Sequence, residues 1–162
     1  GSFVNGTFFA VDGVKTIGAN EGIHFVIGLP TSPMPTTGTA SMNLAGATQP
    51  TFSNGTGAGL GVGTVTSGTL SANFAANTVT TSFSTQYSSG YTYSASGSGT
   101  ISGAGLSGTI SSYTAGMGPV CYPSPCSGSF KGVFAGAGAS YAGYTYLINA
   151  PSFAINGAIV FH

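Results

Sequence analysis

Residues 78–87 read Thr-Val-Thr-Thr-Ser-Phe-Ser-Thr-Gln-Tyr, and their alternating pattern is the clearest indication of the fold in this sequence. Alternate positions form one set, which is Val79, Thr81, Phe83, Thr85 and Tyr87. The residues between them begin with the hydroxyl-bearing run Thr78, Thr80, Ser82 and Ser84. A period of two places successive side chains on opposite faces of a β-strand. The stretch therefore predicts a strand with one buried face and one face in water.

The same alternation recurs on both sides of this stretch. The apolar sets are Ala40, Met42 and Leu44; Ile23, Phe25 and Ile27; and Phe153, Ile155, Ile159 and Phe161, the last with Gly157 between its members. Turn signals separate the segments, among them Asp12-Gly13, Asn54-Gly55, Ser89-Gly90 and Asn156-Gly157. The Asn156-Gly157 pair sits within a strand pattern, so it also fits a bulge. The prolines within residues 29–35 exclude a central strand there.

These spacings predict an all-β fold with eight or nine antiparallel strands. Eight strands consume a chain of 162 residues and can close into a barrel without an edge. Closure is expected because an uncharged sheet lacks the lysines that discourage pairing at open edges. The only plausible helical turn covers residues 135–142. We expect one barrel domain over residues 1–162, a module excised or processed from a longer protein.

Charge is almost absent from the chain. Its charged side chains are Asp12, Lys15, Glu21 and Lys131, and the net charge is zero. Two basic residues give nucleic-acid binding no electrostatic basis. No run of apolar residues is long enough for a membrane helix. Hydroxyl-rich outer faces and the lack of tryptophan disfavour a transmembrane barrel. The uncharged, hydroxyl-rich surface indicates an extracytoplasmic setting, at the cell surface or secreted.

The two cysteines, Cys121 and Cys126, enclose two prolines in a short loop. A zinc site would need further ligands from distant histidines. A disulfide between Cys121 and Cys126 is the better interpretation, and it would fix a loop without supporting the whole fold.

Two segments resemble a known family. Residues 24–40 read HFVIGLPTSPMPTTGTA, and residues 128–140 read GSFKGVFAGAGAS. Together with residues 46–51, 141–143 and 155–158, they resemble the C-terminal β-barrel module of proteobacterial proteins that carry a FecR-type domain. More distantly, they resemble the barrel of transferrin-binding-protein-like surface lipoproteins. The resemblance implies an eight-stranded barrel on a secreted or surface protein, and it carries over no catalytic residue.

The sequence offers little catalytic chemistry. The chain has two carboxylates, and no nucleophile-elbow motif stands at a strand-to-helix turn. His24, with a tyrosine or Met34, is the weak candidate for binding haem or a metal. A structural histidine, hydrogen-bonded in the barrel wall, is the alternative. We therefore expect no enzyme activity and no cofactor.

The leading hypothesis is a non-enzymatic module for recognition or display at the cell surface. Its contact loops would be residues 29–37, 88–93 and 121–126. The candidate contact residues are Pro30, Met34, Tyr87, Tyr91, Tyr93 and Tyr122. The partner would be a surface protein or a glycan. The alternative is a self-assembling structural subunit of a surface layer, filament or matrix, with other copies as its partners.

Overall fold

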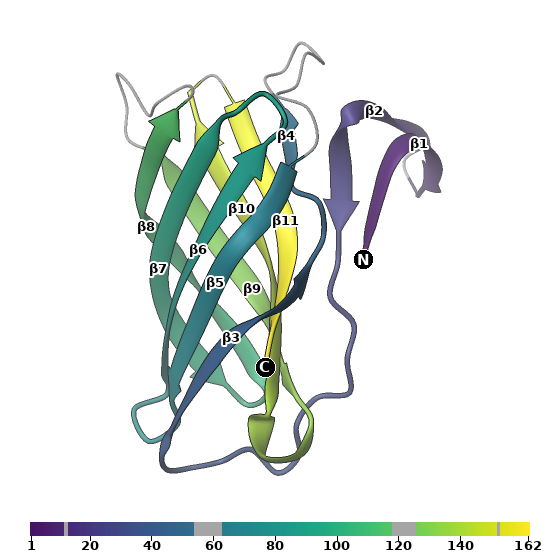
Figure 1. The fold of residues 1–162 in the computed structure, drawn as a ribbon. Coiled ribbons are helices and arrows are strands. Elements are labelled where there is room, and N and C mark those ends of the chain that lie inside the picture. The colour runs from purple at the N-terminus through teal and green to yellow at the C-terminus, as the bar shows by residue number, and fades with distance from the viewer. Residues whose placement is uncertain (12, 54–62, 118–125, 152) are drawn as a thin grey trace.

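The computed structural model describes residues 1–11, 13–53, 63–117, 126–151 and 153–162. Within them the chain forms eleven strands and one short 3₁₀ turn, Ala137–Ala139 (Figure 1). The strands are β1 (Ser2–Ala10), β2 (Gly13–His24), β3 (Thr39–Ala47), β4 (Thr51–Ser53), β5 (Gly63–Asn73), β6 (Thr78–Tyr87), β7 (Thr92–Ser102), β8 (Gly105–Met117), β9 (Ser127–Ala135), β10 (Tyr141–Ala150) and β11 (Phe153–Phe161). The single turn falls within the predicted helical range.

Eight strands close into an antiparallel barrel, as the sequence predicts. Hydrogen bonds connect β10, β9, β8, β7, β6, β5, β3 and β11 in that order, and β11 returns to β10. The short strand β4 pairs with the first half of β11, beyond the end of β3. Strand β11 therefore closes the barrel by pairing with β3 and β4 from its N-terminal part and with β10 from its C-terminal part.

Alternation along β6 is realised as predicted. Val79, Thr81, Phe83, Thr85 and Tyr87 are all buried inside the barrel. The intervening residues face outward. The C-terminal strand behaves in the same way, because Phe153, Ile155, Ile159 and Phe161 are buried. Gly157 lies within an unbroken ladder opposite Tyr146, so Asn156-Gly157 forms neither a turn nor a bulge.

Glycines inside the barrel make room for large aromatic rings. A Cβ atom on Gly157 would lie 2.6 Å from the Tyr146 hydroxyl. At Gly132, opposite Tyr144 in the β9–β10 ladder, a Cβ atom would overlap the backbone oxygen of Gly143. These positions are strand glycines that let neighbouring groups approach closely.

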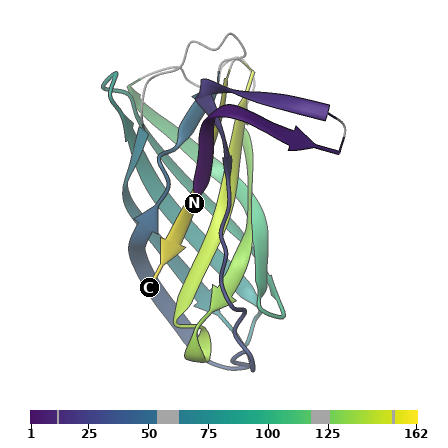
Figure 2. The ribbon, with the colours of Figure 1, turned by 90° about the vertical axis from the view of Figure 1, so that its right-hand side faces the viewer.

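The N-terminal hairpin β1–β2 is a separate element, which the sequence pattern does not predict. It forms its own two-stranded sheet beside the barrel, and Figure 2 shows it projecting from the wall. The strand predicted around Ile23, Phe25 and Ile27 is wrong, because β2 ends at His24. Ile23 and Ile27 are exposed, so these alternating residues do not mark a buried strand face.

After β2 the chain runs along the outside of the barrel to its far end (Figure 2). We call residues 25–31 the strap. Its last residues are anchored at the end of β9: Pro30 forms a bridge with Ala135, and the Thr31 amide donates to the Phe134 carbonyl oxygen at 2.9 Å. We call this the Ala135 end of the barrel, and the opposite end the β6–β7 end.

Candidate functional site

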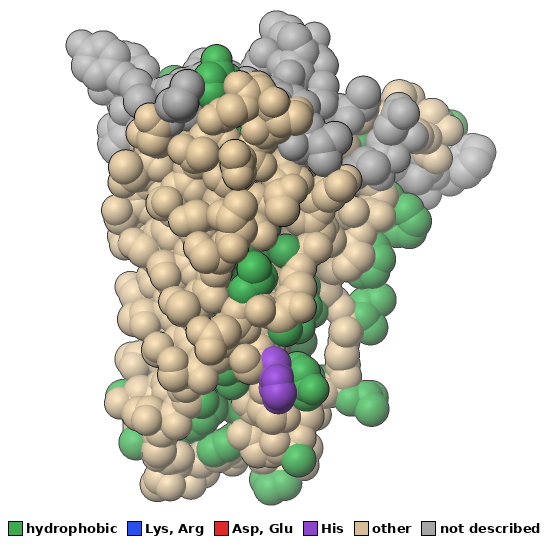
Figure 3. Space-filling model, viewed as in Figure 1, with side chains coloured by type: hydrophobic (Ala, Val, Ile, Leu, Met, Phe, Trp, Pro, Cys, Tyr) green, Lys and Arg blue, Asp and Glu red, His purple; other side chains and the backbone are tan. Residues whose placement is uncertain are grey.

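The outer surface of the molecule has two chemically distinct sides. Among the described residues, nine large apolar side chains are exposed, and all belong to the hairpin region, the strap, β10 or β11. They are Phe3, Val11, Val14, Ile23, Ile27, Leu29, Tyr141, Leu147 and Val160. We call this set the apolar side. In Figure 3 hydrophobic atoms gather beside the hairpin and along the strap, while the wall over β5 and β7 is largely free of them.

The strap supplies the most exposed members of the apolar side. The side chains of Ile27 and Leu29 are 85% and 88% exposed. Between them and the hairpin, Val26 turns toward the barrel, where its Cγ1 atom would lie 2.7 Å from a Cβ atom on Gly143. The absence of a side chain at Gly143 thus lets the strap lie against β10. Because the strap lies against β10, the side chains of Ile27 and Leu29 stay exposed to solvent.

His24 connects the hairpin to the barrel. Its Nδ1 atom lies 2.7 Å from the Thr48 hydroxyl, and its Nε2 atom lies 3.0 Å from the Thr51 hydroxyl. The Thr51 hydroxyl donates to Asn156 Oδ1 on β11 at 2.6 Å. Its oxygen is then the acceptor for the Nε2–H group of His24. The weak candidate for cofactor binding is therefore a structural residue at the base of the hairpin.

The same network fixes the protonation state of His24. The Thr48 oxygen accepts from the Ala158 amide at 2.9 Å. Its hydroxyl has two acceptors within reach, His24 Nδ1 at 2.7 Å and the Ala158 carbonyl oxygen at 3.5 Å, and the shorter distance favours donation to Nδ1. Protonation would turn Nδ1 of His24 from an acceptor into a donor, and the Thr48 hydroxyl could then no longer donate to it. Burial also lowers the pKa of His24 below its ordinary value of 6.5. The neutral imidazole is the form that ties the hairpin to the barrel.

Acidification is expected to weaken this connection. The lowered pKa in the folded state means that the stabilisation is complete above pH 6.5 and is lost as the pH falls toward the folded-state pKa. The protection factors of the β1–β2 amides, which correct the exchange rates for the slower intrinsic exchange in acid, should therefore decrease as the pH is lowered from about 7.5. The variant His24→Gln should show a smaller decrease. An equal decrease in both proteins would contradict this role of His24.

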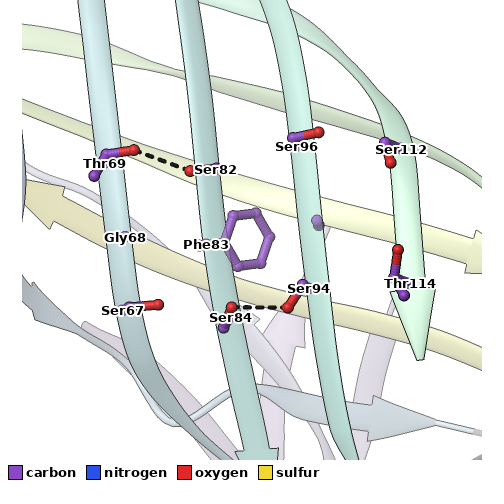
Figure 4. Close-up of a pocket in the computed structure, with 11 residues that line it drawn as sticks. Ser67, Gly68, Thr69, Ser82, Phe83, Ser84, Ser94, Ser96, Ser112 and Thr114 are labelled. Atoms are coloured by element: carbon purple, nitrogen blue, oxygen red, sulfur yellow. Dashed lines mark hydrogen bonds between the residues drawn. The ribbon is translucent and has the colours of Figure 1, made fainter. Parts of the chain in front are cut away.

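A hydroxyl-lined hollow of about 310 Å³ occupies the opposite wall, over β5–β8 (Figure 4). Its rim is formed by outward serines and threonines: Ser67, Thr69, Ser82, Ser84, Ser94, Ser96, Ser112 and Thr114. Two pairs bond across neighbouring strands, Thr69 with Ser82 at 2.9 Å and Ser84 with Ser94 at 2.8 Å. These side chains hydrogen-bond water without adding charge to the wall. Half of the rim hydroxyls are hydrogen-bonded to each other.

The structure separates the predicted contact loops. Pro30 and Met34 belong to the connection at the Ala135 end, whereas Tyr91 follows β6 at the other end of the barrel. Pro30 is exposed, Met34 and Tyr91 are half-buried, and all three stay candidates. Residues 29–37 and 88–93 do not form one contact face.

Two of the predicted contact tyrosines need correction. Tyr87 and Tyr93 are each only 2% exposed and pack inside the barrel. Their rings lie 5.8 Å apart and both contact Phe52. They are core residues because both fall on the inward face of their strands. Tyr122 and Cys121 lie outside the described residues, so the disulfide between Cys121 and Cys126 stays a prediction.

The remaining polar groups in the part of the chain that the structure describes show no catalytic arrangement. The Glu21 carboxylate accepts a hydrogen bond from the Gly18 amide at 3.1 Å within β2, and Asp12 lies outside the described residues. Nowhere in the described ranges do three or more His, Cys, Asp or Glu side chains gather as a metal site would require. Nor do those ranges contain a helix with the length and hydrophobicity needed to cross a membrane.

Comparisons with known proteins identify the barrel and no family. No protein-family model and no curated protein sequence matches the chain. The solved structure of intact Ap-TbpB, with N and C lobes, is similar at 15% identity and a TM-score of 0.51, covering 79% of this chain and 26% of that one. A mutant of transferrin binding protein B from Haemophilus parasuis Hp5 matches at 17% identity and a TM-score of 0.54, covering 79% and 27%.

A structure described as a surface lipoprotein also matches, at 14% identity and a TM-score of 0.50, with 91% of this chain and 72% of that one covered. The chain thus spans about a quarter of the length of the two transferrin binding proteins. At these identities the similarity establishes the fold alone. It supports the resemblance to transferrin-binding-protein-like barrels, whereas the association with a FecR-type domain stays a prediction.

Proposed function

We propose that the chain is a non-enzymatic, extracytoplasmic recognition module that binds a partner protein at the bacterial cell surface through its apolar side. The observation that carries the proposal is the segregation of all nine exposed large apolar side chains of the described residues onto one side. Exposed apolar side chains that gather in one region mark protein interaction sites more often than scattered ones do.

The near-absence of charge defines how such a partner would be held. Only four side chains in the chain are charged, and the net charge is zero. Electrostatic steering is therefore weak, and binding depends on burying Ile27, Leu29 and their neighbours. We expect affinity to change little with salt concentration, in contrast to a binding site built on ion pairs.

The structural neighbours support a surface setting for this fold. One neighbour is described as a surface lipoprotein and two others as transferrin binding protein B. Those descriptions concern the neighbours, and this chain covers only a part of the transferrin binding proteins. They favour recognition over catalysis here without indicating which protein is bound.

The test removes the apolar contact while keeping the barrel. The double variant Ile27→Ser/Leu29→Ser changes two exposed side chains of the strap, and Ser82→Ala/Ser94→Ala changes the opposite wall as a matched control. Immobilised wild-type protein is expected to retain a partner from the extracellular protein fraction. The strap variant should bind that partner at least about tenfold more weakly, and the control should bind it normally. Weaker binding by the control variant alone, or equal binding by the wild type, the strap variant and the control, would refute the apolar side as the contact surface.

Self-assembly is the second candidate, and the position of β1 favours it. In the described residues β1 pairs only with β2, so its other edge has no strand partner. Such an edge can pair with another copy. Light scattering across protein concentration separates the candidates, because ordered oligomers support assembly and a monomer throughout supports recognition of another protein.

A further inference from the structure

The barrel wall opens between β3 and β5. Their ladder ends with Asn43 opposite Thr69, although both strands continue beyond this pair. Figure 1 shows β3 leaving β5 there and crossing to β11. Residues 64–68 of β5 pair with β6 on one side, and among the described residues no strand pairs with them on the other. We call the opening between residues 44–48 and residues 64–68 the slot.

An extra residue in each strand separates the two edges of the slot. On β3, Ala45 has no opposite residue in the ladder with β11. On β5, Thr66 has no opposite residue in the ladder with β6. Such bulges bend a strand and end its regular pairing, and they recur beside functional sites. The slot therefore follows from two bulges that lie just past the last β3–β5 pair.

The slot presents backbone groups that lie beyond the end of the ladder. The Phe74 amide donates to the Gly38 carbonyl oxygen at 3.0 Å, across the β3–β5 seam. Main-chain groups of alternate residues in a strand point to the same side, so those of Gly68 also point toward β3. On the opposite edge, the Thr48 amide donates to β11 at 2.9 Å. The main-chain groups of Ala47 therefore point away from β11 and into the slot.

The slot is a hollow of about 350 Å³, lined by residues 44–49, Thr64 and Val65. Its floor is apolar, because a Cβ atom on Gly68 would lie 3.3 Å from the buried ring of Phe161. The hollow ends where a Cβ atom on Gly63 would lie 3.0 Å from the Pro50 carbonyl oxygen. In Figure 3 hydrophobic atoms reach the surface in the wall between β5 and β11. All residues that line the slot belong to the described part of the chain.

We infer that the slot binds an extended, uncharged segment of a partner protein, which pairs with the edge of β5 as an added strand. The backbone of this guest strand forms the hydrogen bonds that the interrupted ladder leaves unmade, beginning at Gly68. Residues 64–68 span about 16 Å, at about 3.3 Å per residue, so the guest is about five residues long. This contact surface is distinct from Ile27 and Leu29 of the strap, and it does not depend on them.

The chemistry of the slot defines the side chains of the guest. The described charged side chains lie elsewhere, Lys15 and Glu21 on the hairpin and Lys131 on β9. A charged side chain of the guest would therefore lose water without gaining an opposite charge. The apolar floor favours apolar side chains at alternate positions of the guest, with polar ones between them facing water.

A single segment fits the slot better than the edge of a second copy does. The unpartnered edge of β1 belongs to a hairpin, and β1 carries β2 on its other side. Strand β3 borders the slot opposite β5, so a two-stranded guest would have to displace β3. A segment of one extended strand avoids this conflict.

The experiment uses two synthetic peptides, acetyl-Thr-Val-Thr-Val-Thr-amide and the same peptide with every amide nitrogen methylated. Each is titrated to millimolar concentration into isotope-labelled protein, and amide chemical shifts give the affinity. The unmethylated peptide is expected to bind wild type at least about tenfold more tightly, because main-chain hydrogen bonds supply the affinity. It should also slow hydrogen exchange at Gly68 and leave exchange at Leu70, which lies within the ladder, unchanged.

Two variants test the position of the guest. Gly46→Leu fills the slot, where a Cβ atom at Gly46 would have no other atom within 4 Å. Ser98→Leu adds the same side chain to the exposed face of β7 as the matched control. Gly46→Leu should bind the unmethylated peptide at least about tenfold more weakly than wild type does, whereas Ser98→Leu should bind it normally. Thermal unfolding checks that both variants fold, and the comparison of the two peptides on wild type decides if either does not.

Several outcomes would overturn the inference. Equal exchange protection of Gly68 and Leu70 in the protein without peptide would show that the ladder continues past Thr69. Absence of binding by the unmethylated peptide, or equal affinity of the two peptides, would exclude an added strand. Undiminished binding by a folded Gly46→Leu variant would place the peptide elsewhere. Oligomers that Gly46→Leu abolishes, in a protein that binds neither peptide, would assign the slot to a second copy.

Discussion

Replacing Phe161 with alanine is expected to lower the free energy of unfolding by about 3–5 kcal/mol. Phe161 is completely buried, and its ring lies 5.3 Å from that of Tyr144. It sits on β11, which pairs with both β10 and β3 and so closes the barrel. A cavity here would therefore weaken packing at the strand that joins the two ends of the sheet.

Val160→Ala is the matched control for this substitution. Val160 is the preceding residue, faces outward and is 37% exposed. Its truncation should cost about 1 kcal/mol or less. Denaturant unfolding followed by circular dichroism measures both variants. Similar losses for the two variants would contradict the assignment of the inward and outward faces of β11.

Gly132→Ala is expected to cost about 3 kcal/mol, although it adds a single methyl group. The new Cβ atom would overlap the Gly143 carbonyl oxygen and lie 2.6 Å from the Tyr144 Cα atom. These are mostly backbone atoms of β10, so relief requires β9 and β10 to separate. The loss should appear as a lower denaturation midpoint with an unchanged denaturant slope.

Gly46→Ala provides the comparison at a strand glycine with open space. Within 4 Å of a Cβ atom at Gly46 the structure places no other atom. This variant should stay within about 0.5 kcal/mol of wild type. A large loss of stability in Gly46→Ala would show that glycine matters there for a reason other than close approach. Unchanged stability in Gly132→Ala would contradict the close approach of β9 and β10 at this position.

The period-two alternation of apolar and polar residues predicts most of the fold from this sequence. It identified the inward residues of β6 and β11, and the strand spacing indicated a closed eight-stranded barrel. It failed at Ile23, Phe25 and Ile27, where alternating apolar residues belong to a strand end and an exposed strap. Periodicity cannot distinguish a buried strand face from an extended segment that keeps its apolar side chains in water.

The candidate site was less accessible from sequence. The alternation of β6 had placed Tyr87 on the same face as Phe83, yet its neighbouring Ser-Ser-Gly turn suggested a surface role. A tyrosine carries a hydrophobic ring and a polar hydroxyl, so composition fits both positions. Nothing in the sequence indicated that His24 would bond to Thr48 and Thr51, because these contacts depend on how the hairpin lies against the barrel.

The pairing of β11 with β3 has a consequence for biogenesis. Ladder partners such as Leu44 and Phe161 are separated by most of the polypeptide, which gives the barrel a high contact order and predicts slow folding. Until the final strand has been synthesised, the ladders of β3 and β10 lack their closing neighbour. During that interval the two edges are open to pairing with strands of other chains.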